Sequence, residues 1–333
     1  MNSKRSLITG SIIALLLTGC ASSPTFLSPG SSVAAQESQL YMIIFYMALG
    51  VFVLVESLLV YNIIRFGFLK KNDGEEPRQI YGNWHLEVAW TAIPIILVGI
   101  LFYFTVRTMV AVAAPPPGDQ TLKVHIIGHQ WWWEFDYPDL GIITANELHV
   151  PVSKSVALDL DSMDVIHSFW VPQLSGKVDV IPGQTNHLWF KADQVGSYHG
   201  HCAEFCGQNH ANMRIKVVVE SQADFDAWVK NQQQPPVQPQ TEQQQKAYDL
   251  ITNGICSNCH TLGDHQGIRD VGPNLTHLMS RSVFAGATYE LNQDSLHQWL
   301  ADNEDMKPGN RMSTVHITPE QVDELLSYLS NLK

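Results

Sequence analysis

The chain has 333 residues, of which 20 are lysine or arginine and 32 are aspartate or glutamate, so its formal net charge is −12. This length allows roughly two or three domains of ordinary size. The acidic excess argues against nucleic-acid binding and favours a basic soluble protein as a partner. Every cysteine lies in a motif with its own candidate role, which leaves none for a structural disulfide: Cys20, Cys202, Cys206, Cys256 and Cys259.

Residues 1–19 have the pattern of a lipoprotein-type signal peptide. Lys4 and Arg5 precede a short apolar run that ends in small residues, which is typical of a secretory signal and not of a spanning helix. The ending Leu17-Thr-Gly-Cys20 resembles the bacterial lipoprotein cleavage box, so we expect Cys20 to become the lipidated first residue of the mature chain. The alternative is an ordinary or uncleaved signal segment in which Cys20 has no special role.

Residues 20–112 hold an N-terminal segment and two apolar stretches, at about 41–64 and 88–106, that are long enough to cross a bilayer. The loop between them carries an excess of positive charge, from Arg65, Lys70, Lys71 and Arg78. By the positive-inside rule this loop lies in the cytoplasm, so both ends of the hairpin face outward. Two buried core helices of a soluble protein are the alternative, and they fit these lengths and this charge asymmetry poorly.

Residues 118–230 have the pattern of a β-domain. Short runs rich in β-branched residues predict strands at 122–127, 155–160, 187–190 and 213–219, with proline and glycine turns between them. Several short strands at close spacing indicate a β-sandwich or barrel of Greek-key type.

The segment 199–213 concentrates metal-binding side chains within this β-domain. Cys202 and Cys206 are four residues apart, His210 follows at the same spacing, and Met213 lies three residues further on. Thiolates beside imidazole and a thioether form a donor set that favours copper. Two thiolates this close together can bridge two metals, which suggests a binuclear centre. Structural zinc and a disulfide are the rivals, but methionine is a poor zinc ligand and a disulfide explains neither His210 nor Met213.

Residues 231–245 form a Gln/Pro linker that we expect to act as an extended tether, and residues 246–333 return to helical patterns. In that last segment Thr318 is the predicted N-cap of a closing helix, with Pro319 at its first position. The motif Cys256-Ser-Asn-Cys259-His260 is the attachment sequence of a c-type haem. A thioredoxin-like pair or half of a zinc site is the alternative, and the sequence has no second cysteine pair nearby to complete the zinc site.

Taken together, these motifs resemble those of cytochrome c oxidase subunit II. The resemblance covers roughly residues 36–230 and includes the helical hairpin, Gly128-His-Gln-Trp-Trp-Trp133, Lys177-Val-Asp-Val-Ile-Pro-Gly183 and the cysteine segment. It implies a multidomain fold, with a transmembrane hairpin, a cupredoxin-like Greek-key β-sandwich and, from the haem motif, a small all-α cytochrome c domain. It also implies a binuclear copper centre, CuA, whose ligands would be His167, Cys202, Glu204, Cys206, His210 and Met213.

The resemblance gives each of these ligands a role. Cys202 and Cys206 would bridge both coppers, His167 and His210 would each bind one copper, and Met213 would be a weak axial ligand. The backbone carbonyl of Glu204 would bind the other copper, with its side chain toward a magnesium site shared with the catalytic subunit.

Further roles follow from similarity to this family and to cytochrome c. Trp131 matches the aromatic residue at which electrons enter, with simple packing as the alternative. Glu87 matches a carboxylate near the entrance of a proton pathway, with an interfacial anchor as the alternative. Met312 matches the distal haem ligand, with Met306 and Met279 as competitors. Pro273 matches the residue whose carbonyl accepts a hydrogen bond from the proximal imidazole.

The implied function is that of subunit II in a haem-copper terminal oxidase. Electrons would pass from cytochrome c or a bc-type complex through haem c and CuA to subunit I, where oxygen is reduced to water with proton translocation. The implied partners are subunits I and III, and the implied location is the outer side of a bacterial cytoplasmic membrane. The electron-entry subunit of a CuA-containing nitric oxide reductase is the alternative. A copper-free quinol oxidase subunit fits the complete ligand set poorly, and a copper-delivery protein does not explain the haem.

Overall fold

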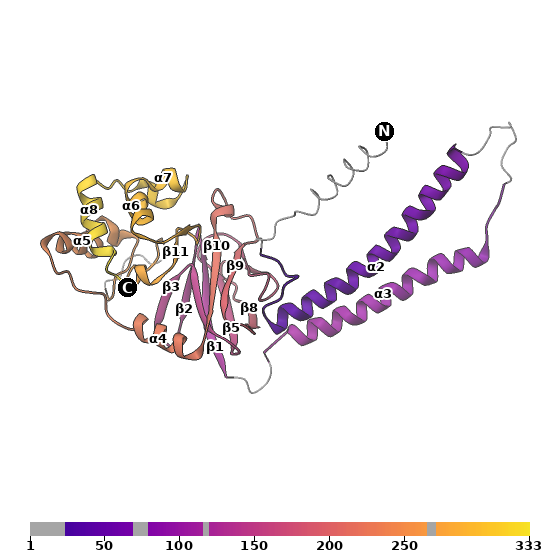
Figure 1. The fold of residues 1–333 in the computed structure, drawn as a ribbon, viewed down its shortest axis with the longest axis horizontal. Coiled ribbons are helices and arrows are strands. Elements are labelled where there is room, and N and C mark those ends of the chain that lie inside the picture. The colour runs from indigo at the N-terminus through magenta and orange to yellow at the C-terminus, as the bar shows by residue number, and fades with distance from the viewer. Residues whose placement is uncertain (1–23, 69–78, 116–119, 265–270) are drawn as a thin grey trace, which may run out of the picture.

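The computed structural model describes residues 24–68, 79–115, 120–264 and 271–333. A long helical hairpin, a β-sandwich and a small helical domain follow one another along the chain (Figure 1). The hairpin and the helical domain lie at opposite ends of the β-sandwich. The predicted signal peptide and Cys20 lie outside the described residues.

The hairpin consists of α2 (Ser32–Asn62), which continues into the π-helical η1 (Ile63–Phe68), and α3 (Trp84–Val112). Side chains of Ser31 and Asn83 accept hydrogen bonds from the first-turn amides and so begin the two helices. Both helices are apolar, largely exposed and long enough to cross a bilayer. They extend beyond the predicted spans because their capped first turns precede the apolar runs.

Both outer ends of the hairpin are bonded to the β-sandwich. The hydroxyl of Ser31 donates to the carbonyl of Leu174, and Ser31 forms a β-bridge with Ala192. At the other end, the indole nitrogen of Trp189 donates to the carbonyl of Val112 at 2.8 Å. The β-sandwich is therefore attached to each spanning helix separately.

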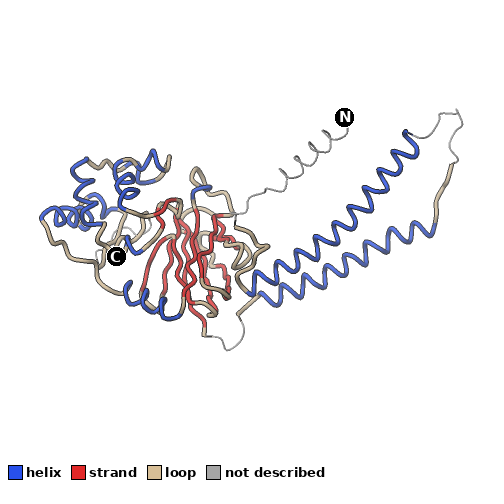
Figure 2. Tube along the Cα trace, in the orientation of Figure 1, coloured by secondary structure: helices blue, strands red, loops and turns tan. Residues whose placement is uncertain are grey.

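The β-sandwich contains two five-stranded sheets, drawn red in Figure 2. The first has the order β3-β2-β1-β5-β8 and the second β4-β10-β9-β6-β7. The strands of the first sheet are β1 (Thr121–His129), β2 (Trp132–Tyr137), β3 (Ile142–Ala145), β5 (Ser155–Ser162) and β8 (Asn186–Lys191). Those of the second are β4 (Glu147–Pro151), β6 (His167–Trp170), β7 (Val178–Val180), β9 (Gly196–Cys202) and β10 (Arg214–Glu220).

Residues facing the space between the sheets are buried at alternate positions, as β10 shows, and this alternation places one core between the two layers. All four predicted β-runs form strands, so the predicted β-sandwich is confirmed. Helix α4 (Gln222–Gln232) was not predicted. Its Phe225 and Trp228 pack against the sandwich core.

The C-terminal domain contains α5 (Glu242–Thr252), α6 (Gln293–Ala301), α7 (Asn303–Met306) and α8 (Pro319–Leu329). Short 3-10 turns lie between them: η3 (Ile255–Asn258), η4 (Leu278–Ser280) and η5 (Arg311–Thr314). Thr318 caps α8 in a capping box with Gln321, and Pro319 opens the helix as predicted. A hairpin of β11 (Val283–Phe284) and β12 (Tyr289–Glu290) was not predicted.

The predicted linker, residues 231–245, is hydrogen-bonded to both domains. The side chain of Gln233 donates to the carbonyl of Leu140 in the β-sandwich at 2.8 Å. The hydroxyl of Tyr328 in α8 donates to the carbonyl of Val237 at 2.8 Å. These bonds hold the linker along the protein surface.

Candidate functional site

Sulfur and nitrogen donors converge at one end of the β-sandwich. The ligand atoms of His167, Cys202 and Cys206 lie within 4.8 Å of one another, and all three residues are buried. The two sulfurs are 3.8 Å apart, far beyond the bond length of a disulfide, which is about 2.0 Å. Nδ1 of His210 lies 3.6 Å and Sδ of Met213 3.9 Å from Sγ of Cys206. The structure therefore brings the predicted side-chain ligands together.

The sheet and one loop position these donors. His167 begins β6 and Cys202 ends β9, and these strands are neighbours through the pair Phe169 and Cys202. The loop after Cys202 folds back on itself, because the amide of Cys202 donates to the carbonyl of Met213 at 2.9 Å. The carbonyl of Glu204 lies 3.2 Å from Sγ of Cys202, whereas its side chain is exposed. Two strands and a closed loop thus supply all the donors.

Asp164 orients His167, a role that sequence reasoning missed. Its carboxylate accepts a hydrogen bond from Nε2 of His167 at 2.8 Å, so the other nitrogen, Nδ1, faces Cys202 at 3.8 Å. Burial alone would lower the pKa of His167, but its bonds with Asp164 and Cys202 outweigh burial and raise that pKa. A carboxylate three residues before a predicted ligand was the available signal.

The donor set fits a copper pair better than zinc. Buried thiols, imidazoles and a thioether are soft ligands, and a fully buried Met213 placed beside Cys206 has no role at a structural zinc site. Gly128 packs against the ring of His167: a Cβ added there would lie 2.8 Å from Cδ2 of His167. The site therefore holds its imidazole in place by close packing as well as by Asp164.

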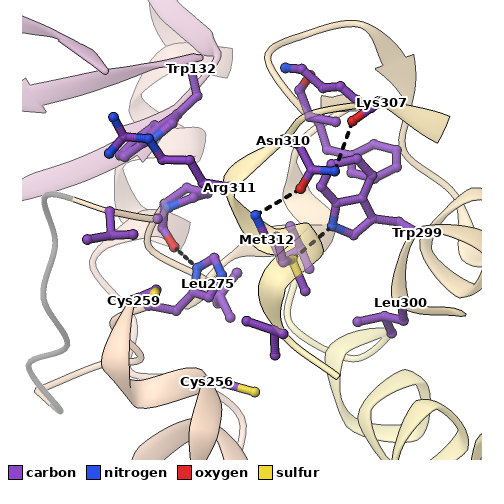
Figure 3. A pocket seen from close by; sticks show the side chains of 18 of the residues that line it. Trp132, Cys256, Cys259, Leu275, Trp299, Leu300, Lys307, Asn310, Arg311 and Met312 are labelled. Carbon is purple, nitrogen blue, oxygen red and sulfur yellow. Dashed lines mark hydrogen bonds between the residues drawn. The ribbon is translucent and has the colours of Figure 1, made fainter. Parts of the chain in front are cut away.

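A cavity of about 490 Å³ lies in the helical domain and is lined by Cys256, Cys259, His260 and Met312 (Figure 3). Its other walls are largely apolar, from Leu275, Leu296, Trp299, Leu300, Leu325 and neighbouring residues. A large apolar cavity beside two thiols and an imidazole suits a covalently attached haem. Of the three candidate methionines, which are all described, Met312 is the one that lines it.

The surroundings of His260 suit an iron ligand. Its Nδ1 donates to the carbonyl of Pro273 at 2.7 Å, which leaves Nε2 for a metal. Burial lowers the pKa of His260, so the ring stays neutral, as metal binding requires. A Cβ at Gly272 would lie 2.7 Å from Cε1 of His260, so only glycine fits beside the ring. Across the cavity, the indole nitrogen of Trp299 donates to Sδ of Met312 at 3.2 Å.

The two sites meet at Trp131. This residue lines the haem-sized cavity together with Gln130, Trp132 and Asn146, although all four belong to the β-sandwich. On its other side, the indole nitrogen of Trp131 donates to the carbonyl of Cys206 at 3.0 Å. One residue therefore both borders the cavity and bonds to a residue of the thiol pair.

Glu87 lies far from both sites, in the first turn of α3. Its carboxylate accepts a hydrogen bond from the backbone amide of Asn83 at 3.0 Å, which helps to begin the helix.

Comparison with known proteins divides the chain into three matches. Residues 21–106 match the family "Cytochrome C oxidase subunit II, transmembrane domain", residues 140–221 match "Cytochrome C oxidase subunit II, periplasmic domain", and residues 244–333 match "Cytochrome c".

Two relatives match nearly the whole of this chain. The chain is 35% identical to "Cytochrome c oxidase subunit 2" of Alkalihalophilus pseudofirmus, a match that covers 97% of this chain and 95% of the relative. It is 37% identical to the protein of the same name from Bacillus sp. (strain PS3), over the same shares of the two chains. "Quinol oxidase subunit 2" of Bacillus spizizenii is 34% identical and matches 66% of this chain and 70% of that protein.

Proposed function

Because this chain belongs to the cytochrome c oxidase subunit II family and carries a C-terminal cytochrome c domain, we propose that it relays electrons to an oxygen-reducing subunit I. The relay would run from an external donor to a haem held by Cys256 and Cys259, then to a copper pair held by Cys202 and Cys206. When bound, the haem and the copper pair each take up and release one electron at a time. The residues of this chain would fix the positions of the two groups and influence their reduction potentials.

Trp131 is the observation that carries this proposal. It lines the cavity proposed to hold the haem, and its indole nitrogen donates to the carbonyl of Cys206, so a single residue connects the two proposed sites. Electron tunnelling falls steeply with through-space distance and less steeply through bonded contacts. Trp131 therefore supplies a short bonded connection between the two proposed sites.

The haem-domain residues would hold the haem iron in a fixed arrangement. The carbonyl of Pro273 accepts a hydrogen bond from Nδ1 of His260, which fixes the ring orientation and leaves Nε2 free to bind iron. Met312 lines the cavity and would supply the second protein ligand, and a His/Met pair would favour a high reduction potential. A high potential suits a haem that must receive electrons from another cytochrome.

The copper-domain residues hold their metals rigidly. His167 is locked by Asp164 and by the close approach of Gly128, and the loop from Cys202 to Met213 is closed by a backbone bond. A site that changes little in shape between oxidation states needs little reorganisation and transfers electrons quickly. We assign the carbonyl of Glu204 to one copper and its exposed side chain to magnesium at the interface with subunit I.

The two spanning helices place this relay at a membrane, with both globular domains beyond the same ends of the hairpin. We assign those domains to the outer side of a bacterial cytoplasmic membrane. Glu87 then lies near the cytoplasmic ends of the spans, where it would donate protons to a pathway in subunit I.

Metal analysis of the purified full-length chain tests this proposal. We expect two coppers for each haem iron and an electron paramagnetic resonance signal shared by both coppers. One copper per haem, or zinc in place of copper, would refute the binuclear assignment. The Cys206→Ser variant should lose the shared signal and keep its haem, because the haem cysteines lie in the other domain.

A further inference from the structure

The helical domain sits on the loops that carry the copper ligands, and one hairpin makes much of this contact. The docking hairpin is defined as residues 281–290: the two residues before β11, then β11, the turn and β12. The carbonyl of Gly286 in this turn accepts a hydrogen bond from the amide of Arg214 at 2.8 Å. The hydroxyl of Thr288 donates to the carbonyl of Asn212 at 2.9 Å. Since Asn212 and Arg214 flank Met213, the turn holds the backbone on both sides of a proposed copper ligand.

Lys307 joins the docking hairpin to the β-sandwich from inside the interface. Its Nζ donates to the carbonyls of Trp131 at 3.1 Å, Asn212 at 3.0 Å and Ala285 at 2.9 Å. Burial lowers the pKa of Lys307 to about 7. In its protonated form the amine has three N–H donors, and these three carbonyls satisfy all of them. Lys307 is only 3% exposed, so these bonds are shielded from water and none of the three acceptors is easily replaced.

The shape of the turn is adapted to this close contact. Ala285, Gly286 and Ala287 all have positive φ angles, of 52°, 77° and 54°. A Cβ added to Gly286 would lie 2.7 Å from the carbonyl oxygens of Trp131 and Asn212 and 2.8 Å from Nζ of Lys307. Only glycine therefore lets the turn reach the two carbonyls that Lys307 binds.

A second set of bonds holds the base of the docking hairpin. The carboxylate of Glu147 accepts hydrogen bonds from the amide of Ser282 at 2.7 Å and from its hydroxyl. The buried Arg281 donates to the hydroxyl of Thr144 at 3.2 Å and to the carbonyl of Asn274 at 2.7 Å. Asn274 follows Pro273, so Arg281 connects the proximal side of the haem cavity to the β-sandwich.

A third contact comes from the loop that carries Met312. Arg311 donates to the side chain of Gln130 at 2.7 Å and lies 3.5 Å from the carboxylate of Asp164, which in turn binds His167. The first and third contact regions end on residues that border or bind proposed copper ligands. The helical domain therefore covers the side of the β-sandwich on which Trp131 lies.

We propose that Lys307 and the docking hairpin form an interdomain latch, which fixes the haem domain over Trp131 and closes this side of the copper domain to any other electron donor. This inference rests on the proposed relay. It goes beyond that relay because it makes the haem the single point at which an external donor can deliver an electron. Each electron would then leave the haem iron, oxidising it from iron(II) to iron(III), and reduce the copper pair by one.

Two latch variants of the full-length chain test this inference. Lys307→Met removes the ammonium and keeps an apolar stem, and Gly286→Ala adds the clashing Cβ. Lys246→Met is the control for charge, because Lys246 is a half-exposed haem-domain lysine that pairs with Glu324 at 3.6 Å, away from the interface. Gly141→Ala is the control for backbone strain, because Gly141 has a φ of +66° and nothing within 4 Å of its Cβ position.

Hydrogen exchange and hydroxyl-radical oxidation report the latch without any cofactor signal. In both latch variants, peptides covering 209–216 and 281–290 should exchange about tenfold faster or more, because charge-assisted bonds or the close fit are lost. Oxidation of Trp131 should rise several-fold, with Trp170 as an internal reference. Peptides from β1 and β5 should exchange as in the wild type, which shows that the sandwich is still folded.

Photochemical injection of an electron onto the haem reports the functional effect. Transfer from haem to copper should become at least about tenfold slower in both latch variants and stay unchanged in both controls. The latch would be overturned if both latch variants exchanged, and oxidised Trp131, at the rates of the wild type. It would also be overturned if Trp131 in the wild type were oxidised as fast as the tryptophan of a short peptide. If even the wild type binds no copper, the relay fails, while exchange and oxidation still decide whether the latch exists.

Discussion

Asp164 and His167 are joined by a hydrogen bond of 2.8 Å through the ring nitrogen that faces away from Cys202. This bond sets the tautomer and the angle of the imidazole at the copper site.

Removing this carboxylate should loosen the copper site. In Asp164→Ala we expect copper affinity to fall by about 10–100-fold, because an unsupported imidazole must be ordered when metal binds. Competition titration with a copper chelator measures this change. Asp159→Ala is the matched control, since Asp159 binds the exposed His187 at 2.7 Å in the same way but away from the site. Equal losses in the two variants would contradict the orienting role of Asp164.

Trp131→Phe should slow electron transfer between the two sites and leave both sites loaded. An aromatic ring is kept at this position, but the hydrogen bond from Nε1 to the carbonyl of Cys206 is lost. We expect a rate about tenfold lower after photochemical reduction of the haem, with unchanged copper and iron content. Trp170→Phe is the control, because Trp170 lies on β6 in the other sheet, where its ring contacts His201. An unchanged rate in Trp131→Phe would show that the hydrogen bond is not part of the path.

Replacing the candidate axial methionines one at a time should identify the haem ligand. Met312→Leu should lower the haem midpoint potential and change the iron spin state, because the axial thioether is lost. Met306→Leu and Met279→Leu should leave both unchanged, since neither residue lines the cavity. Optical titration against a redox dye gives the potentials. A fall in potential in Met306→Leu alone would move the assignment to that residue.

Glu147 should make the stability of the folded chain depend on pH in the acidic range. Burial alone would raise its pKa, but bonds with His149 and Ser282 and the charge of Lys216 lower the pKa from 4.5 to about 2. Its ionised form therefore stabilises the folded chain above pH 4.5, and this contribution is lost as the pH falls toward about 2. The pKa difference corresponds to about 3 kcal/mol at most. Other charged or titratable groups around it include Tyr137, Glu220 and Arg281.

Thermal unfolding of the wild type and Glu147→Gln at a series of pH values tests this dependence. The wild type should melt at a higher temperature above pH 4.5, and the two proteins should converge as the pH approaches about 2. Glu242→Gln, at an exposed and distant ion pair with Lys246, should follow the wild type throughout. A constant difference between wild type and Glu147→Gln down to the lowest pH would contradict the lowered pKa.

The local chemistry of both sites could be predicted from the sequence, because it depends on residue types and their spacing along the chain. The segment from Cys202 to Met213 and the motif from Cys256 to His260 use residue types that few other structures require at such spacing. The capped helix at Thr318 was also predictable, since a capping side chain and a first-position proline act within one turn.

The contacts between the domains could not be predicted in this way. Lys307 binds backbone carbonyls of Trp131, Asn212 and Ala285, and every residue has a carbonyl, so such acceptors leave no trace in the sequence. The strands of the docking hairpin are two residues long, too short for any periodic pattern. Asp164 lies close to His167 in the sequence, but its role depends on a turn that only the fold reveals.

The two attachments of the membrane hairpin have a mechanical consequence. Ser31 ties the start of α2 to Leu174, and Trp189 ties the end of α3 to the β-sandwich, so the copper domain stands on two legs. A domain joined to a single flexible segment can change its orientation above the bilayer, whereas a domain bonded to two helices must follow the tilt of both. The height of the thiol pair above the lipid surface is therefore set by the spans themselves. In the proposed relay, bilayer thickness would therefore affect the distance from the thiol pair to the electron acceptor in subunit I.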